Sequence, residues 1–507
     1  VTDLKEARLA NEHQDLWLER LNTRFQWRSL GRRNWSLHFA DLLFDDGEQS
    51  WTAPRLSLAR DTAAGLGLWI SADRLPLGVP LRLARTIMAI YGTPWPPALP
   101  GAATGIVSDL DLVLNASWRL VMARGEVAQA RLSDWGRWPE LAGLDASVAL
   151  GPDSGRLRLR GAAVVVDWPR MFREPLTLVI PACTVAVDWG RGWQAGISDC
   201  AIENDDLALH GETMLRSNSG RPAIDLNVVV TRGRIARLGP YWPESVLREK
   251  TKAWLRMGLA GGEIVSGRVL LRGDLDDWPF RDGEGRFEAV ARVADGRLDY
   301  QAGWPAARSV EAVARFVGPG MEIRGKVGDI GGVEAREVSA VIADFKAPIL
   351  NVDYAADSDL PRLLGFLLSS PLRERIDADL SRFRFAGPAV ARGSLRIPFG
   401  SVPGSLSVNG AVELEDGRFS DPQLGVAIEG IAGSVAYSEH GFAAGALAAE
   451  LRGKPARLRL VADARAAEKF RAELTGDFTV ADVTPPFLAE ELSRLSHAEG
   501  ECAWTVA

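Results

Sequence analysis

The sequence predicts an all-β protein with a few short helices, in which degenerate repeats build an elongated, twisted, U-shaped antiparallel β-groove. Apolar and polar residues alternate with a period of two over many segments, as in strands with one buried and one solvated face. Turns are predicted between these segments at Gly151–Gly155, Asp295-Gly296 and Asp416-Gly417, which favours antiparallel meanders over βαβ units. A net charge of −7 and a hydrophobic share of 47% exclude a disordered chain and a nucleic-acid binder driven by bulk charge.

The apolar positions of the alternating segments are the candidate groove-lining residues. Each alternates with polar neighbours, as Leu157 and Leu159 do with arginines. Some are small, such as Ala289 and Ala291, so a curled sheet would keep room inside. The candidates are Leu157, Leu159, Ile224, Leu226, Val228, Phe287, Ala289, Ala291, Val293, Leu406, Val408, Val412, Leu414, Leu458 and Leu460.

A degenerate repeat underlies the alternation. Arg131–Val148 and Arg297–Ala314 both run from a strand-like segment through Trp-Pro into a second strand-like segment. A third copy, Gly417–Val435, carries a proline at the same point. Each copy predicts strand, turn and strand, so one supersecondary unit is stacked along the chain.

Helical spacing interrupts the alternation in a few places, which we expect to be lids or end-plugs on the sheet. Predicted helices cover 3–21, 81–90, 243–259 and 360–368, the last followed by Pro371–Arg373. The expected order along one continuous groove is a leading helix (1–27), groove repeats (28–235), a helix plus repeat (236–356), a second helix plus repeat (357–480) and the start of a further repeat (481–507).

No motif for catalysis or metal binding stands out. The five histidines lie far apart, and the acidic stretch Asp274–Glu284 lacks the spacing of a calcium loop, so a solvated turn is the better interpretation. Nucleophile elbows, phosphate-binding loops and dinucleotide fingerprints do not occur. We therefore expect no enzymatic activity, no cofactor and no metal.

Cysteine usage leaves two alternatives. Cys183 and Cys200 flank the stretch Trp189–Trp193 almost symmetrically, which would allow a cross-strand disulfide in an oxidising compartment. Two separately buried thiols are the favoured interpretation, since three cysteines are too few for a disulfide scaffold.

An apolar trough without catalytic groups suits an acyl chain as its ligand. Exposing one methylene to water costs about 0.8 kcal/mol, so a two-chain lipid with about 30 methylenes faces a barrier on the order of 25 kcal/mol. A continuous apolar groove removes most of that barrier.

Several segments resemble YhdP-type AsmA-like proteins: Trp35–Leu42, Tyr241–Leu255, Gly267–Gly273, Asp277–Phe280 and Pro371–Arg373. The resemblance extends from about residue 28 to the end of the chain. It implies a periplasmic protein of the Gram-negative envelope that moves phospholipids between the inner and outer membranes without chemical conversion. It also implies an inner-membrane anchor in a segment absent from this chain, and outer-membrane or periplasmic proteins as further partners. No catalytic residue is carried over, and no nucleic acid is expected.

Two other functions compete with lipid conduction. A structural or assembly scaffold for envelope proteins would use the same sheet with a dry core filled by its own side chains. A carbohydrate-active or adhesive β-solenoid would need carboxylates and aromatics on one solvated face, whereas the carboxylates here lie mostly in turns.

Overall fold

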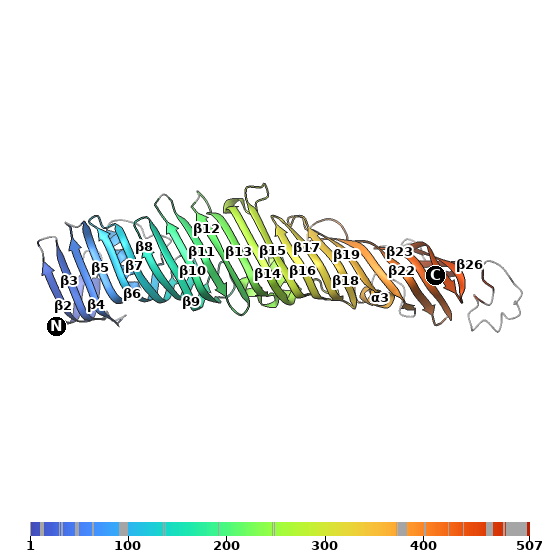
Figure 1. Cartoon of the computed structure of the whole chain (residues 1–507), viewed down its shortest axis with the longest axis horizontal. Coiled ribbons are helices and arrows are strands. Elements are labelled where there is room, and N and C mark those ends of the chain that lie inside the picture. The colour runs from blue at the N-terminus through green and yellow to red at the C-terminus, as the bar shows by residue number, and fades with distance from the viewer. Residues whose placement is uncertain are drawn as a thin grey trace. The chain divides into compact units, whose positions relative to one another are not determined.

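A computed structural model gives the fold, and Figure 1 shows the course of the chain. The structure describes residues 2–10, 15–29, 31, 34–45, 50–62, 65–90, 100–134, 136, 138–190, 192–217, 219–245, 247, 249–371, 373, 383–399, 402–423, 425–439, 441–462, 470–479, 482 and 504–506. The chain forms two compact units, and each is described by itself.

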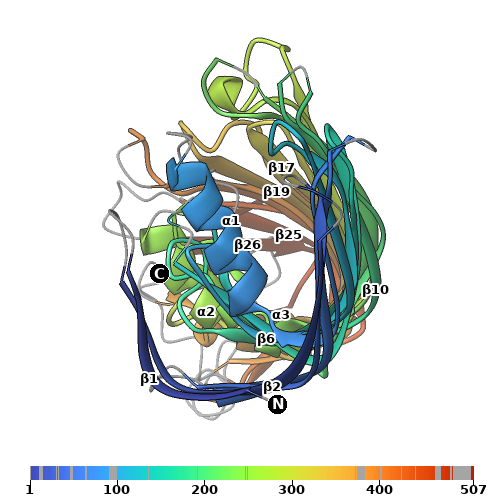
Figure 2. The same cartoon turned by 90° about the vertical axis from the view of Figure 1, so that its left-hand side faces the viewer.

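Unit 1 consists of Val1–Thr231, Arg237–Arg248 and Val269–Trp278. Each strand from β1 to β12 pairs antiparallel with the next. The sheet curves around α1 (Gly78–Ile90), which lies on its concave side (Figure 2). The strands are β1 (Thr2–Ala10), β2 (Asp15–Ser29), β3 (Trp35–Asp45), β4 (Ser50–Asp61), β5 (Leu66–Pro76), β6 (Ala102–Asn115), β7 (Leu120–Ser133), β8 (Glu140–Leu150), β9 (Ser154–Asp167), β10 (Leu176–Asp188), β11 (Gln194–Glu203) and β12 (Leu207–Arg216).

Unit 2 consists of Arg232–Ala236, Glu249–Arg268 and Pro279–Ala507 and contains α2 (Glu249–Gly258) and α3 (Leu360–Leu368). Its strands also form an antiparallel meander, with the short β20 beside β22. They are β15 (Arg286–Leu298), β16 (Ala307–Val317), β17 (Gly320–Ile330), β18 (Val333–Ile342), β19 (Ile349–Asp359), β20 (Arg384–Ala386), β21 (Pro388–Pro398), β22 (Ser407–Asp421), β23 (Val426–Ser438), β24 (Gly441–Leu451), β25 (Lys454–Ala462), β26 (Phe470–Gly476) and β27 (Trp504–Val506).

Two further strands and the 3-10 helices η1 to η3 also lie among the described residues. Residues of β13 (Ala223–Arg234) and β14 (Leu259–Asp274) are divided between the units. The 3-10 helices are η1 (Ile235–Arg237), η2 (Gly239–Tyr241) and η3 (Leu275–Asp277). The predicted fold class, all-β and antiparallel with a few short helices, is confirmed.

The three repeat copies form the predicted strand-turn-strand units, which are β7–β8, β15–β16 and β22–β23. Helices α1, α2 and α3 lie where helical spacing predicted them. Two predicted turns are wrong, because Asp295-Gly296 and Asp416-Gly417 lie inside β15 and β22 at shifts of the strand register. β-Bulges and tight turns favour the same residue types, such as Asp-Gly. Asp295 has a positive φ of 48°, which such a bulge accommodates.

The leading helix predicted over 3–21, and with it the helical segment 1–27, is wrong. These residues form β1 and β2, which pair so that Leu9 lies opposite Leu16 and Ala7 opposite Leu18. Leu16 and Leu18 are two residues apart, which places them about 200° apart around a helix but on the same face of a strand. Pairing with β3 adds a second hydrogen-bonded ladder to β2. The remaining domain borders stay a prediction, and 481–507 lies outside the described residues except 482 and 504–506.

A disulfide joins Cys183 in β10 to Cys200 in β11. The favoured interpretation as two separate thiols is therefore wrong, and the cross-strand alternative is confirmed. Cys183 lies opposite Leu159 in the register and is 7% exposed. Such a bond is typical of proteins in oxidising compartments.

We expect this disulfide to be detectable by alkylation. In denaturant without reductant, a maleimide should label Cys502 alone, and after reduction it should label Cys183 and Cys200 as well. Reduction should also lower the free energy of unfolding by about 2 kcal/mol or more, because the unfolded chain loses a cross-link. Labelling of all three cysteines before reduction would contradict the pairing.

Candidate functional site

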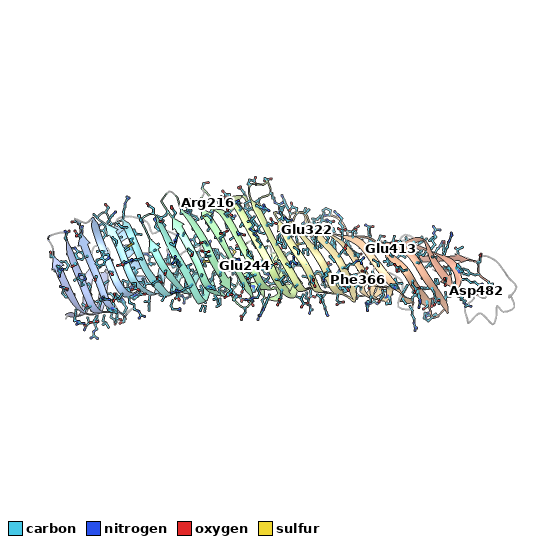
Figure 3. All side chains as sticks on the ribbon, in the orientation of Figure 1. Arg216, Glu244, Glu322, Phe366, Glu413 and Asp482 are labelled. Atoms are coloured by element: carbon cyan, nitrogen blue, oxygen red, sulfur yellow. A yellow bond between two sulfur atoms is a disulfide. The ribbon has the colours of Figure 1, made fainter. Side chains whose placement is uncertain are left out.

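The two faces of each sheet differ in chemistry. The inner face is the one that carries the hydrophobic clusters, and Leu77, directly before α1, packs on this face in unit 1. The outer face carries charged residues, among them Glu322 and Glu413, which Figure 3 labels along the strands of unit 2. Alternation along each strand produces this division.

In unit 2, the strand register joins half-buried apolar residues of the inner face into one continuous row. Each residue of this row lies opposite the next one on the neighbouring strand. All of them remain partly accessible. We call this row the open strip of unit 2: Ala291, Ala314, Ile323, Ala340, Val352 and Leu395.

A second row on the same face is filled by the chain's own side chains. This packed strip of unit 2 is buried except at Val412, which is half-buried. Leu363 and Phe366 of α3 pack against its cluster, and so does Tyr300, whose pKa burial raises to about 12. The packed strip comprises Val310, Val327, Ala335, Ala356, Ala391 and Val412.

Unit 1 also has a packed strip and an open strip on its inner face. Its packed strip joins Leu75, Val107, Val127, Ala146, Leu159 and Cys183 through the register, and all but Leu159 are buried. Its open strip is half-buried and comprises Val148, Leu157, Val185 and Ile197. Each unit therefore has one filled row and one partly accessible apolar row on its inner face.

The structure separates the predicted groove residues into these classes. Leu157 and Ala291 lie in open strips, whereas Leu159 and Val412 lie in packed strips. Val408, Leu414 and Leu458 are only 6%, 8% and 6% exposed, because neighbouring side chains cover them. The half-buried remainder lies outside the strips: Ile224, Leu226, Val228, Phe287, Ala289, Val293, Leu406 and Leu460.

Ile224, Leu226 and Val228 alternate with Asp225 and Asn227, whose side chains bond Arg272 and Glu212 and thereby mark the outer face. Leu406 precedes β22 and lies outside any strand.

The sequence alone did not identify most residues of the two open strips. In β17, Met321 and Ile323 alternate with Glu322 and Arg324 in the same pattern that identified the other segments, so the signal was present. Val185 and Ile197 were harder to find, because threonine, alanine and glycine surround them and weaken the contrast between the two faces.

Ion pairs between neighbouring strands stabilise the outer face. Arg124 of β7 donates to Asp111 of β6 over 2.6 Å, and this hydrogen bond lowers the pKa of the Asp111 carboxyl. Hydrogen bonds from Arg286 and then Arg315 lower the pKa of Glu288 in the same way. These exposed pairs mark the face that contacts water.

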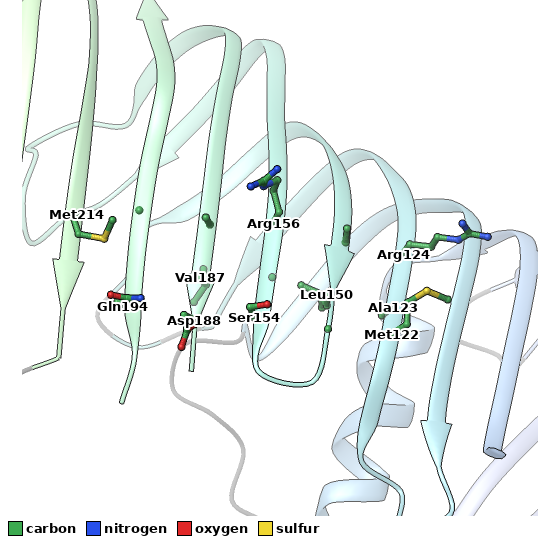
Figure 4. A pocket seen from close by; sticks show the side chains of 15 residues that line it. Met122, Ala123, Arg124, Leu150, Ser154, Arg156, Val187, Asp188, Gln194 and Met214 are labelled. Carbon is green, nitrogen blue, oxygen red and sulfur yellow. The ribbon is translucent and has the colours of Figure 1, made fainter. Parts of the chain in front are cut away.

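An open hollow of about 660 Å³ lies on unit 1 and includes outer-face positions (Figure 4). Met122 and Met214 line it together with Arg124 and Arg156. Gly196 lies beneath Met214, and a Cβ there would approach the Met214 methyl carbon to 3.1 Å. Since the outer-face row through Arg124, Ala149, Arg156 and Ala186 crosses it, this hollow is distinct from the open strip.

The acidic stretch between β14 and β15 forms turn contacts. Asp274 caps η3 by accepting from the Asp276 amide, and Asp276 accepts from the Arg221 amide over 2.9 Å. In the part of the chain that the structure describes, no group of three or more histidine, cysteine, aspartate or glutamate side chains is arranged to hold a metal ion. No helix among those residues is both long and apolar enough to cross a membrane.

Comparison with known proteins identifies the family of this chain. The chain is 21% identical over 364 residues to the intermembrane phospholipid transporter YhdP of Escherichia coli (strain K12), a match that covers 70% of this chain. The matched region is 28% of the length of that relative. No solved structure matches the chain significantly. The family model described as YhdP protein matches residues 2–506, and the chain therefore belongs to the YhdP family.

Proposed function

We propose that the open strips carry the acyl chains of phospholipids that move between the inner and outer membranes. The observation that supports this proposal is the continuity of half-buried apolar residues across successive strands in each unit. Ordinary sheets cover such a face with another layer. An acyl chain laid along this row would cover its apolar side chains as a second layer does in an ordinary sheet. No chemical step is needed for this.

The proposed setting is the periplasm, with membrane contacts made by other parts of a longer protein. The name of the Escherichia coli relative states intermembrane phospholipid transport, and the disulfide suits an oxidising compartment. The function requires neither catalysis nor a cofactor. Further envelope proteins as partners are part of the same proposal.

Photo-crosslinking in cells tests this function. We expect a photoreactive amino acid at Ile323, in the open strip, to form adducts with phospholipid. The same amino acid at the neighbouring exposed Arg324, on the outer face, should form none. Val327, 9% exposed in the packed strip, is a second control, because its side chain contacts the protein's own residues.

The outcome distinguishes lipid conduction from the assembly scaffold. Phospholipid adducts at Ile323 alone would support conduction. Adducts only to protein at Ile323 would contradict it and would favour the assembly scaffold, whose core is filled by its own side chains.

A further inference from the structure

Two tyrosines face each other on the inner face of unit 2, in the row between the open strip and the packed strip. Tyr354 of β19 and Tyr437 of β23 are separated by two strands, and the register places Gly393 and Gly410 between them. Their hydroxyl oxygens are 2.6 Å apart. The pair therefore spans four strands.

The intervening glycines make room for the two rings. A Cβ at Gly393 would lie 2.5 Å from the Tyr437 oxygen and 2.9 Å from the Tyr354 oxygen. At Gly410 it would lie 2.3 Å from the Tyr437 ring. No residue larger than glycine fits at either position without moving a ring.

The hydrogen-bond partners determine which tyrosine hydroxyl is the donor in each bond. Tyr437 also lies 3.1 Å from the Arg392 carbonyl oxygen, which can only accept, so Tyr437 donates there. Tyr354 is then the donor in the bond between the two hydroxyls. Burial raises the pKa of both phenols, so both keep their protons at neutral pH.

Packing alone does not require these hydroxyls. Phenylalanine would cover the glycines as well, and Phe442 lies next to Tyr437 in the register on β24. Both tyrosines are half-buried, so a ligand in the neighbouring open strip can reach them. In the register, Val352 of that strip is two residues from Tyr354 on the same face of β19.

We propose that Tyr354 exchanges its hydrogen bond with Tyr437 for one to an acceptor oxygen of a phospholipid in the open strip. The acceptor is an ester carbonyl or a phosphate oxygen of the lipid. Replacing one neutral hydrogen bond by another leaves the free energy nearly unchanged, so the exchange with an ester carbonyl is readily reversible. A bond to the charged phosphate oxygen would be stronger. This proposal rests on the proposed function and adds a polar contact to an otherwise apolar path.

The exchange predicts opposite effects for the two hydroxyls. Tyr354→Phe removes the donor that the lipid would use. Tyr437→Phe removes the acceptor that competes with the lipid and leaves Tyr354 free to donate. Both variants keep a ring over the glycines, but Tyr437→Phe also loses the bond to the Arg392 carbonyl. A purely structural pair would therefore lose at least as much with Tyr437→Phe as with Tyr354→Phe.

The test measures phospholipid retained by the purified full chain after incubation with vesicles of phosphatidylethanolamine and phosphatidylglycerol, by native mass spectrometry over a range of lipid concentrations. We expect Tyr354→Phe to weaken retention about threefold to tenfold, as the loss of one hydrogen bond would. Tyr437→Phe should bind as tightly as the unaltered chain or more tightly, and the double variant should resemble Tyr354→Phe. Thermal unfolding of each variant is measured alongside.

The outcomes separate this contact from the function on which it rests. Equal retention in all variants, or a loss in Tyr437→Phe that is as large as in Tyr354→Phe or larger, would overturn the contact and leave the lipid path intact. An unaltered chain that retains no phospholipid would overturn both. Repeating the titration with diether lipids identifies the acceptor: an effect of Tyr354→Phe that disappears indicates the ester carbonyl, and one that persists indicates the phosphate.

Discussion

Val352→Asp is expected to slow phospholipid movement by at least about 100-fold. Val352 lies in the open strip between Ala340 and Leu395, so an aspartate there places a carboxylate in the proposed path of the acyl chains. Removing an unpaired carboxylate from water costs several kcal/mol, and each 1.4 kcal/mol on a barrier is about a tenfold change in rate. The measurement is the transfer of radiolabelled phospholipid from the inner to the outer membrane in cells that produce the full-length protein.

The adjacent residue provides the matched control. Asn351 is exposed on the outer face of the same strand and lies opposite Arg396, so Asn351→Asp adds the same charge in a solvated setting. It should leave transfer within about twofold of the unaltered rate. Because Val352 is half-buried, Val352→Asp should still fold, with a stability loss of about 1–2 kcal/mol. Equal transfer by the two variants, both folded, would contradict the assignment of the open strip.

Period-two alternation was enough to predict the fold class, because it depends on one physical rule that holds along most of the chain. The same rule identified Leu157 and Ala291, which lie on the inner face as expected. It failed at 3–21, where alternation and helical spacing competed over a short stretch. Pairing of β1 with β2 and of β2 with β3 decided between them, and strand pairing is not encoded in any single segment.

Alternation cannot separate an open strip from a packed one. Val408 and Leu395 lie opposite each other, yet Val408 is buried while Leu395 is half-buried. Val408 has a contact from a residue distant in sequence, because the Glu439 carboxylate accepts a hydrogen bond from its amide. Elsewhere on this face, Leu363 of α3 packs against two buried clusters of unit 2. Bulges also shift the register within single strands, as between Leu414 and Gly417. The sequence therefore predicts which face is apolar, and tertiary packing decides which part of it stays accessible.

The buried clusters of the inner face explain why the accessible rows can exist, because a sheet with a half-exposed apolar face needs stability from elsewhere. Leu447 of β24 is a centre of that stability: it is 1% exposed and lies opposite Leu458 in the largest cluster of unit 2. A Cβ at Gly433 would come within 2.9 Å of the Leu447 side chain, so the glycine makes room for it.

We therefore expect Leu447→Ala to lower the free energy of unfolding by about 3–5 kcal/mol, since the cavity adds to the lost transfer free energy. Val313→Ala is the control, because Val313 is 38% exposed on the outer face, and it should cost less than about 1 kcal/mol. Denaturant titration followed by circular dichroism measures both. A loss below about 1 kcal/mol for Leu447→Ala would mean that this cluster does not hold unit 2 together. Lipid adducts at Ile323 should survive the substitution under native conditions, since Leu447 lies in a buried cluster and Ile323 in the open strip.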